Sequence, residues 1–103
     1  MVAAAMTPAA FKLSLSKPAP LSRVAPALAA LWWAGKGDWA RAHKLVMDDD
    51  SREAAWVHAY LHRVEGDDGN AKYWYRQARQ RPATGALDAE WEDIAKALLA
   101  RVH

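Results

Sequence analysis

Two histidines and a glutamate within one predicted helix are the residues of this sequence best suited to chemistry. With 100° of rotation per residue, His58 and His62 lie about 40° apart on that helix, and Glu65 lies about 20° from His58. Histidines at positions i and i+4 can chelate a metal ion, and a carboxylate can supply a third ligand. His43, in the preceding predicted helix, could approach the same site. The set would suit Zn²⁺ or an Fe²⁺ centre with two histidines and one carboxylate.

A structural role for the same residues is the main alternative. His58 and His62 flank an apolar stripe beside Ala55 and Ala59, where imidazoles often serve as hydrogen-bonded packing residues. Glu65 could simply pair with a nearby cation. The spacing also differs from the His-Glu-x-x-His helix of metalloproteases, because position 59 is alanine. The sequence therefore leaves packing, metal or acid–base chemistry, and a ligand pocket open.

A second group of residues combines cations with aromatic rings. Lys72, Arg76 and Arg79 fall on one stripe of a predicted helix, and Trp74 and Tyr75 point to the other side. Basic and aromatic residues together can bind nucleic acid. The same stripe is also typical of a solvated helix edge. Nucleic acid or another anionic partner is therefore the third function that we consider, behind the two described below.

Other residue patterns favour packing over chemistry. Trp32 and Trp33 are consecutive, so one is expected in the core and the other at an edge or an interface. The three aspartates at 48–50 lack the spaced ligands of an EF-hand and indicate a solvated helix end. Glu90 and Asp93 suit the negative charge that a helix start favours. There is no cysteine, which excludes disulfides, thiolate metal sites and thiol nucleophiles.

Five helices with short connections are expected to position these residues. Apolar residues recur with helical spacing, and no segment alternates for long enough to predict a sheet. Asp38 and Ser51 are good N-caps for two of the helices. The sequence thus predicts an all-α fold in a single domain at 22–103. It contains two antiparallel hairpins at about 22–47 and 51–81, and a C-terminal capping helix at about 88–102.

The first 21 residues differ from the rest in composition. They are rich in alanine, proline and serine, and Pro8, Pro18 and Pro20 disfavour helix in the residues before them. We expect an extended or flexible arm over residues 1–21, with a short turn of helix at Pro8 to Leu13 as the exception. Residues 1–37 hold four of the cations and no acid, although the net charge of the 103 residues is only +2.

Membrane insertion and secretion are not expected. No apolar run reaches the roughly 20 residues that a membrane span needs. The first ten residues lack the charged and continuous apolar regions of a secretory signal. The cytoplasm is the predicted location.

A short pattern occurs twice, 29 positions apart. Each copy has Gly-Asp, three intervening residues and then Ala, between one predicted helix and the next. The glycine permits a tight reversal, and the alanine lets two antiparallel helices approach closely. The copies are Gly37-Asp38 with Ala42 and Gly66-Asp67 with Ala71.

This pattern resembles the tetratricopeptide repeat over roughly residues 25–82. Ala71, Tyr75 and Ala78 match the second-helix pattern of that family, whereas Val46 replaces its aromatic residue. The spacing of 29 is also shorter than the family's usual length of about 34. The stretch from Trp56 to Arg76 is similar to a group of small uncharacterised bacterial proteins, and this similarity implies no activity.

The resemblance implies a protein- or peptide-binding or scaffolding module, which is the leading prediction. Helical hairpins of this kind offer a concave groove lined by the first helix of each pair. Here it would include Trp33, His58, His62 and Glu65. This function needs no cofactor and makes an enzymatic role the less favoured one. A solenoid of only two repeats leaves an end uncovered, which favours a homodimer. The runner-up is a small metal-binding or enzymatic protein that uses the His/Glu cluster.

Overall fold

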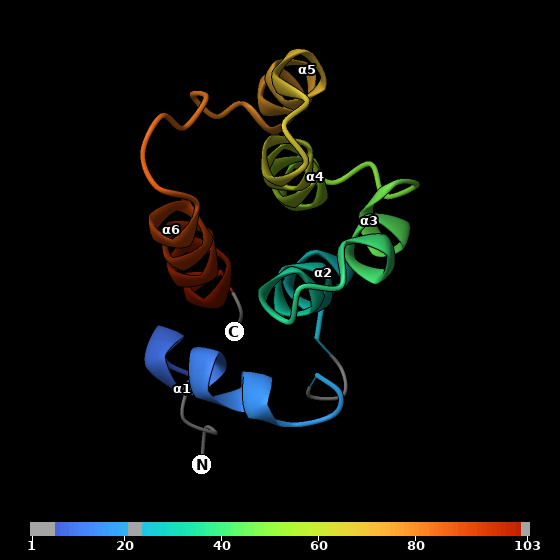
Figure 1. The fold of residues 1–103 in the computed structure, drawn as a ribbon. Coiled ribbons are helices and arrows are strands. Elements are labelled where there is room, and N and C mark those ends of the chain that lie inside the picture. Colours follow the sequence, from blue (N-terminus) through green and yellow to red (C-terminus); the bar gives the residue numbers. More distant parts are fainter. Residues whose placement is uncertain (1–5, 21–23, 102–103) are drawn as a thin grey trace.

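The computed structural model describes residues 6–20 and 24–101, and every regular element in these ranges is helical. Figure 1 shows their arrangement. The predicted all-α fold is confirmed. None of the described helices combines the length and the apolar content that crossing a bilayer requires. The elements are α1 (Pro8–Leu13), a 3₁₀ turn (Ser14–Ser16), α2 (Pro26–Gly35), α3 (Trp39–Val46), α4 (Arg52–Val64), α5 (Asp68–Ala78) and α6 (Leu87–Ala100).

The two Gly-Asp turns have the same local geometry. Gly37 and Gly66 adopt φ values of 81° and 85°, in the left-handed region that favours glycine. Asp38 and Asp67 follow with φ of −96° and −95° and ψ of 78°, and each side chain accepts a hydrogen bond from the amide three residues on. The repeated sequence therefore makes the same helix start twice. Helix α5 begins at Asp68, directly after the capping residue Asp67.

The chain forms two helical hairpins, α2–α3 and α4–α5, as expected. Helix α4 packs against both helices of the first hairpin, and α5 lies on its far side (Figure 1). Ala42 and Ala71, the alanines of the repeated pattern, are both buried where the paired helices approach. This arrangement brings α3, α4 and α5 together around the predicted histidine cluster.

Helix α6 does not cap an end of the hairpin stack, contrary to the prediction. It lies along the side of the stack, against α2 and α4 and away from α3 (Figure 1). Its apolar stripe of Ile94, Ala95 and Leu98 is buried there. Trp91 fixes the contact by donating from its indole Nε1 to the backbone oxygen of Leu31 at 2.8 Å.

The short turn of helix expected at Pro8 to Leu13 is present as α1, and a 3₁₀ turn follows it. This part of the predicted arm is therefore not extended but packs against α6. Thr7 caps α1, and Phe11 is 3% exposed with its ring stacked on Trp91 at 5.5 Å. Trp32 donates from its Nε1 to Ser14 Oγ at 3.0 Å. The burial of Phe11 and the cap by Thr7 stabilise α1, although the nearby prolines disfavour helix in the residues before them. The predicted helix start near Ser22 and helix end at 102 lie outside the described residues, and α2 begins at Pro26.

Candidate metal centre

Three imidazoles meet in the interior between the two hairpins. One ring nitrogen from each of His43, His58 and His62 lies within 4.8 Å of the others. The Nε2 atoms of His43 and His58 are 3.1 Å apart. His58 and His62 are buried, with exposed fractions of 3% and 8%, and His43 is half-buried. The structure thus brings together the three histidines that the sequence predicted for one site.

Two helices supply the histidines, and indole rings hold two of them. His58 and His62 are one helical turn apart on α4, with ring centroids 4.9 Å apart, and His43 reaches them from α3. The ring of Trp39 stacks on His43 at 4.6 Å, and Trp74 of α5 stacks on His58 at 3.9 Å. Because these stacks restrict the rotation of both rings, the cluster is preorganised.

Glu65 contacts the cluster through the ring of His62. Its Oε1 lies 2.7 Å from Nδ1 of His62. A carboxylate on one ring nitrogen orients a histidine and makes its other nitrogen a better ligand, which is the usual arrangement behind metal-bound histidines. Glu65 is thus the hydrogen-bond partner of His62, and His43 is the third member of the cluster.

A second group, closer to the surface, shares one of these histidines. His62, Glu65 and Asp67 also place ligand atoms within 4.8 Å of one another. These atoms already have partners, because Glu65 bonds His62 and Asp67 accepts from the backbone and side chain of Asn70 as the cap of α5. The three-histidine group is therefore the better candidate.

The surroundings keep two of the imidazoles neutral. Burial, together with smaller effects of the neighbouring His43 and His62, lowers the pKa of His58 from its ordinary 6.5 to about 4. Burial and His62 also lower the pKa of His43, against an opposing effect of Glu65. Neutral imidazole is the form that binds a metal ion. At neutral pH, both residues are therefore in the ligating state.

One pair of nitrogens in the cluster already has nearly the separation of two ligands on a tetrahedral ion. Bonds of about 2.0–2.1 Å from Zn²⁺ to histidine nitrogen place two ligand nitrogens about 3.3 Å apart, close to the 3.1 Å between His43 and His58. His58 Nδ1 is buried and has no hydrogen-bond partner among the described residues. An unpaired buried polar atom is unfavourable by about 1–3 kcal/mol, and a metal ion would satisfy this one if Nδ1 in place of Nε2 were the ligand atom of His58.

The indole partners of the histidines were not recognised from the sequence as part of this site. The sequence placed Trp74 only on the side of its helix opposite the basic stripe and gave Trp39 no role in a site. Trp39 lies four positions before His43, which is a spacing that brings side chains together on a helix. Its Nε1 also donates to the backbone oxygen of Leu61 at 2.7 Å, which ties α3 to α4.

The residues predicted to line a groove do not share one surface. His58 and His62 face α3 and α5 in the interior. Trp33 is half-buried beneath the guanidinium of Arg41, whose carbon lies 4.5 Å from the ring centroid, while Trp32 is buried in the core. Glu65 is bonded to His62. The face of α2 and α4 where a groove would lie is covered by α6.

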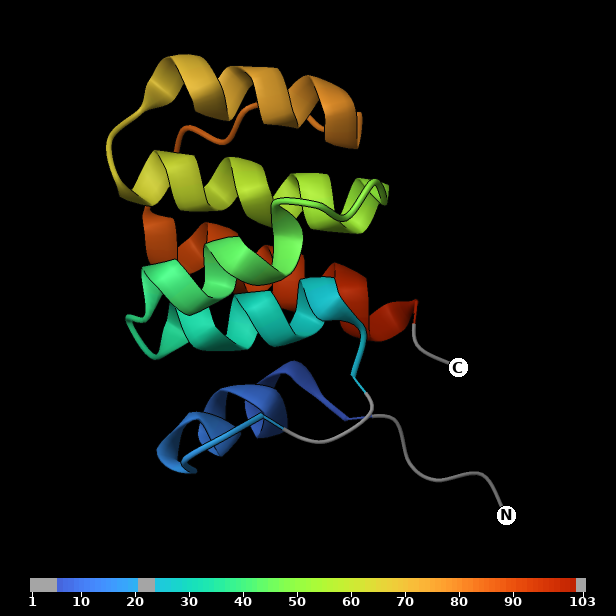
Figure 2. The same ribbon diagram turned by 90° about the vertical axis from the view of Figure 1, so that its right-hand side faces the viewer.

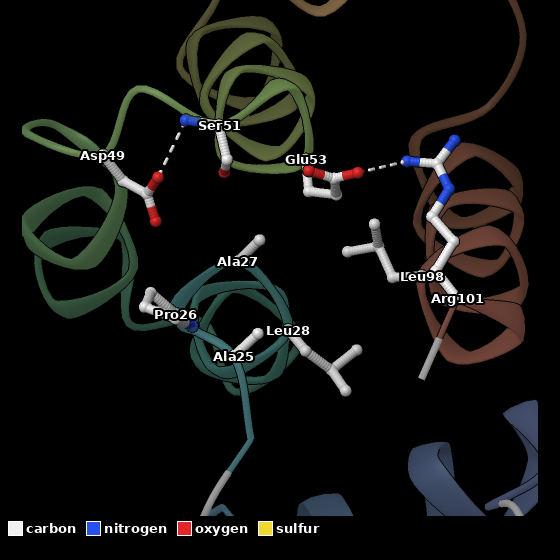
Figure 3. Close-up of a pocket in the computed structure, with 9 residues that line it drawn as sticks. All are labelled: Ala25, Pro26, Ala27, Leu28, Asp49, Ser51, Glu53, Leu98 and Arg101. Carbon is white, nitrogen blue, oxygen red and sulfur yellow. Dashed lines mark hydrogen bonds and ion pairs between the residues drawn. The ribbon is translucent and has the colours of Figure 1, made fainter. Parts of the chain in front are cut away.

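A separate cavity of about 340 Å³ lies between the starts of α2 and α4 and the end of α6 (Figure 3). Leu28 and Leu98 contribute to its apolar wall, and Glu53 pairs with Arg101 across it at 2.9 Å. No predicted site residue lines it. Asp49, its third charged side chain, accepts a hydrogen bond from the backbone amide of Ser51. Because all three charged groups have partners, the cavity is a weaker candidate than the histidine cluster.

A buried carboxylate joins three helices away from the histidines. Glu90 of α6 is 6% exposed and lies 2.8 Å from Nη1 of Arg63 on α4. It also accepts from the hydroxyl of Tyr75 on α5, and Arg63 donates to the backbone oxygen of Gly85. Burial and Glu90 raise the pKa of Tyr75. Because these groups satisfy one another, the cluster is structural.

Comparisons of the chain with protein-family models, with curated proteins and with solved structures give no match. The tetratricopeptide resemblance therefore stays a prediction, and the functional argument rests on the histidine cluster.

Proposed function

We propose that this protein is a metal-binding helical module in which His43, His58 and His62 hold one late first-row divalent ion. The observation that carries the proposal is the meeting of three ring nitrogens within 4.8 Å of one another. Nitrogen donors of this kind suit Zn²⁺, Cu²⁺ or Ni²⁺ and not Mg²⁺ or Ca²⁺, which prefer oxygen. Three protein ligands would leave a fourth coordination position open to water or to another ligand.

The ion would join the two hairpins. His43 belongs to the first hairpin, and His58 and His62 belong to the second. An ion that binds the folded protein and not the unfolded chain stabilises it by about 2.7 kcal/mol when its free concentration is a hundred times its Kd. Metal occupancy would thus control how firmly α3 is held against α4.

Isothermal titration of the tag-free protein with Zn²⁺ tests this function. We expect one ion per chain for the wild type and for His103→Ala, which removes the fourth histidine of the sequence as a control. The double variant His58→Ala/His62→Ala should lose binding. His43→Ala changes only a half-buried residue and should weaken binding while the circular dichroism spectrum stays helical. Mg²⁺ should not bind. Equal Zn²⁺ binding by the wild type and a folded His43→Ala variant would contradict the proposal.

The protein- or peptide-binding role that led the sequence analysis stays a prediction. It depended on a groove over α2 and α4, and α6 packs on that face. The histidine cluster therefore supports metal binding better than it supports a groove.

A further inference from the structure

The outer face of helix α5 takes no part in the metal centre. Helix α5 lies at one end of the stack and buries Ala71, Tyr75 and Ala78 on one side (Figure 2). Its other side is open. Lys72 and Arg76 are exposed on it, and Arg79 is exposed just beyond its end.

Positive charge is concentrated on this face and just beyond its end, and Asp68, one turn before Lys72, is the one acid of α5. Lys72, Arg76, Arg79 and Arg81 are all exposed, and none forms an ion pair within residues 6–20 and 24–101. The sequence has no acid from residue 69 to residue 87. Other exposed cations, such as Lys44 and Lys96, also form no ion pair among the described residues, but they lie on separate helices, whereas these four lie within ten positions of one another.

An exposed aromatic ring lies beside one of these cations. Tyr73 is 45% exposed, and the guanidinium carbon of Arg76 is 6.0 Å from its ring centroid. The ring rests edge-on against Trp74 at 5.0 Å, and Trp74 is itself stacked on His58. Tyr73 therefore offers a fixed aromatic surface to a partner.

From this placement, we infer that the outer face of α5 binds single-stranded nucleic acid. Lys72 and Arg79 are about 10 Å apart along the helix, which lets the cations contact successive phosphates of one strand. An unstacked base can lie on the ring of Tyr73, as in other single-strand binding surfaces. A duplex keeps its bases stacked inside, and an acidic peptide has no base, so neither would use this ring.

Fluorescence anisotropy with a labelled oligothymidine tests the inference. Three or four phosphate contacts predict a slope of about −2 to −3 in log K against log salt, or a loss of roughly 20- to 50-fold between about 50 and 200 mM salt. Lys72→Gln/Arg76→Gln should weaken binding by tenfold or more. The control Lys44→Gln/Lys96→Gln removes the same charge from exposed residues outside the face and should have a small effect.

The aromatic contact has its own pair of variants. Tyr73→Ala should lose about tenfold in affinity, and Tyr73→Phe, which keeps the ring, should bind as the wild type does. The inference is overturned by any of four results. These are no binding at low salt, equal losses in the two charge variants, full affinity of Tyr73→Ala, or equally effective competition by polyglutamate or duplex DNA. Circular dichroism would confirm that each variant is folded. All these measurements are made with a chelator, so that they are independent of the metal centre.

Discussion

The buried imidazole of His58 makes the stability of the metal-free protein depend on pH. The pKa of this residue is about 4 in the folded protein and about 6.5 in the unfolded chain. Between these values the unfolded chain holds a proton that the folded protein does not. The stability linked to His58 is therefore present above about pH 6.5 and is lost as the pH falls toward 4.

The size of the effect follows from the two pKa values. Relative to neutral pH, titration of His58 lowers the free energy of unfolding by about 1.4 kcal/mol at about pH 5.5 and by about 2.5 kcal/mol at about pH 4.5. This is a large share of the roughly 5–15 kcal/mol by which domains are stable. His43, whose pKa is also lowered, acts in the same direction.

The variant His58→Phe isolates this contribution. Phenylalanine keeps a planar ring against Trp74 and removes both nitrogens, including the unpaired Nδ1. Urea unfolding of both proteins, followed by circular dichroism with a chelator from about pH 7.5 to about pH 4.5, gives the two stability curves. The variant should lose about 2.5 kcal/mol less than the wild type over this range. Parallel curves would refute the reasoning, because they would mean that His58 titrates alike in the folded and unfolded states.

Three other substitutions test separate parts of the structure. Glu65→Gln should weaken Zn²⁺ binding about 10- to 100-fold, measured by competition with a chromophoric chelator, because it replaces the carboxylate behind His62. Arg79→Gly should raise the free energy of unfolding in urea by about 1 kcal/mol, since Arg79 has a φ of 58° at the end of α5. Glu90→Ala should lower it by about 3–5 kcal/mol, because it leaves the largely buried Arg63 unpaired. An unchanged Zn²⁺ affinity for Glu65→Gln, or an unchanged free energy of unfolding for either of the other two variants, would contradict the role given to that residue.

Helix starts were predictable from sequence because they depend on neighbouring residues. Asp38 and Ser51 cap their helices as expected, through side-chain bonds to amides three positions on. Helix α1 was treated mainly as an arm because its stability comes from Phe11 packing on Trp91, eighty positions away. The position of α6 was also not predictable, since an apolar stripe shows that a face is buried but not which helices cover it.

The sequence predicted which residues form the candidate site better than it predicted which of them contact one another. The spacing of His58 and His62 placed them on one face, and His43 was expected to approach them from the preceding helix, as it does in the structure. Glu65 was expected beside His58, yet it bonds His62, three positions before it, because side chains at this spacing are also neighbours. The burial of Glu90 was not predicted, because its partner Arg63 is 27 positions away in the sequence. The neighbouring residues indicated only a negative charge that suits a helix start.

Titration of the tag-free protein with Co²⁺, followed by its visible absorption, tests the central claim most directly. We expect absorption bands typical of tetrahedral nitrogen coordination, with an end point at one ion per chain and loss of the bands in His58→Ala/His62→Ala. Addition of Zn²⁺ should also remove them. A spectrum that stays that of the hydrated ion at every ratio would contradict the account and leave the three histidines as packing residues.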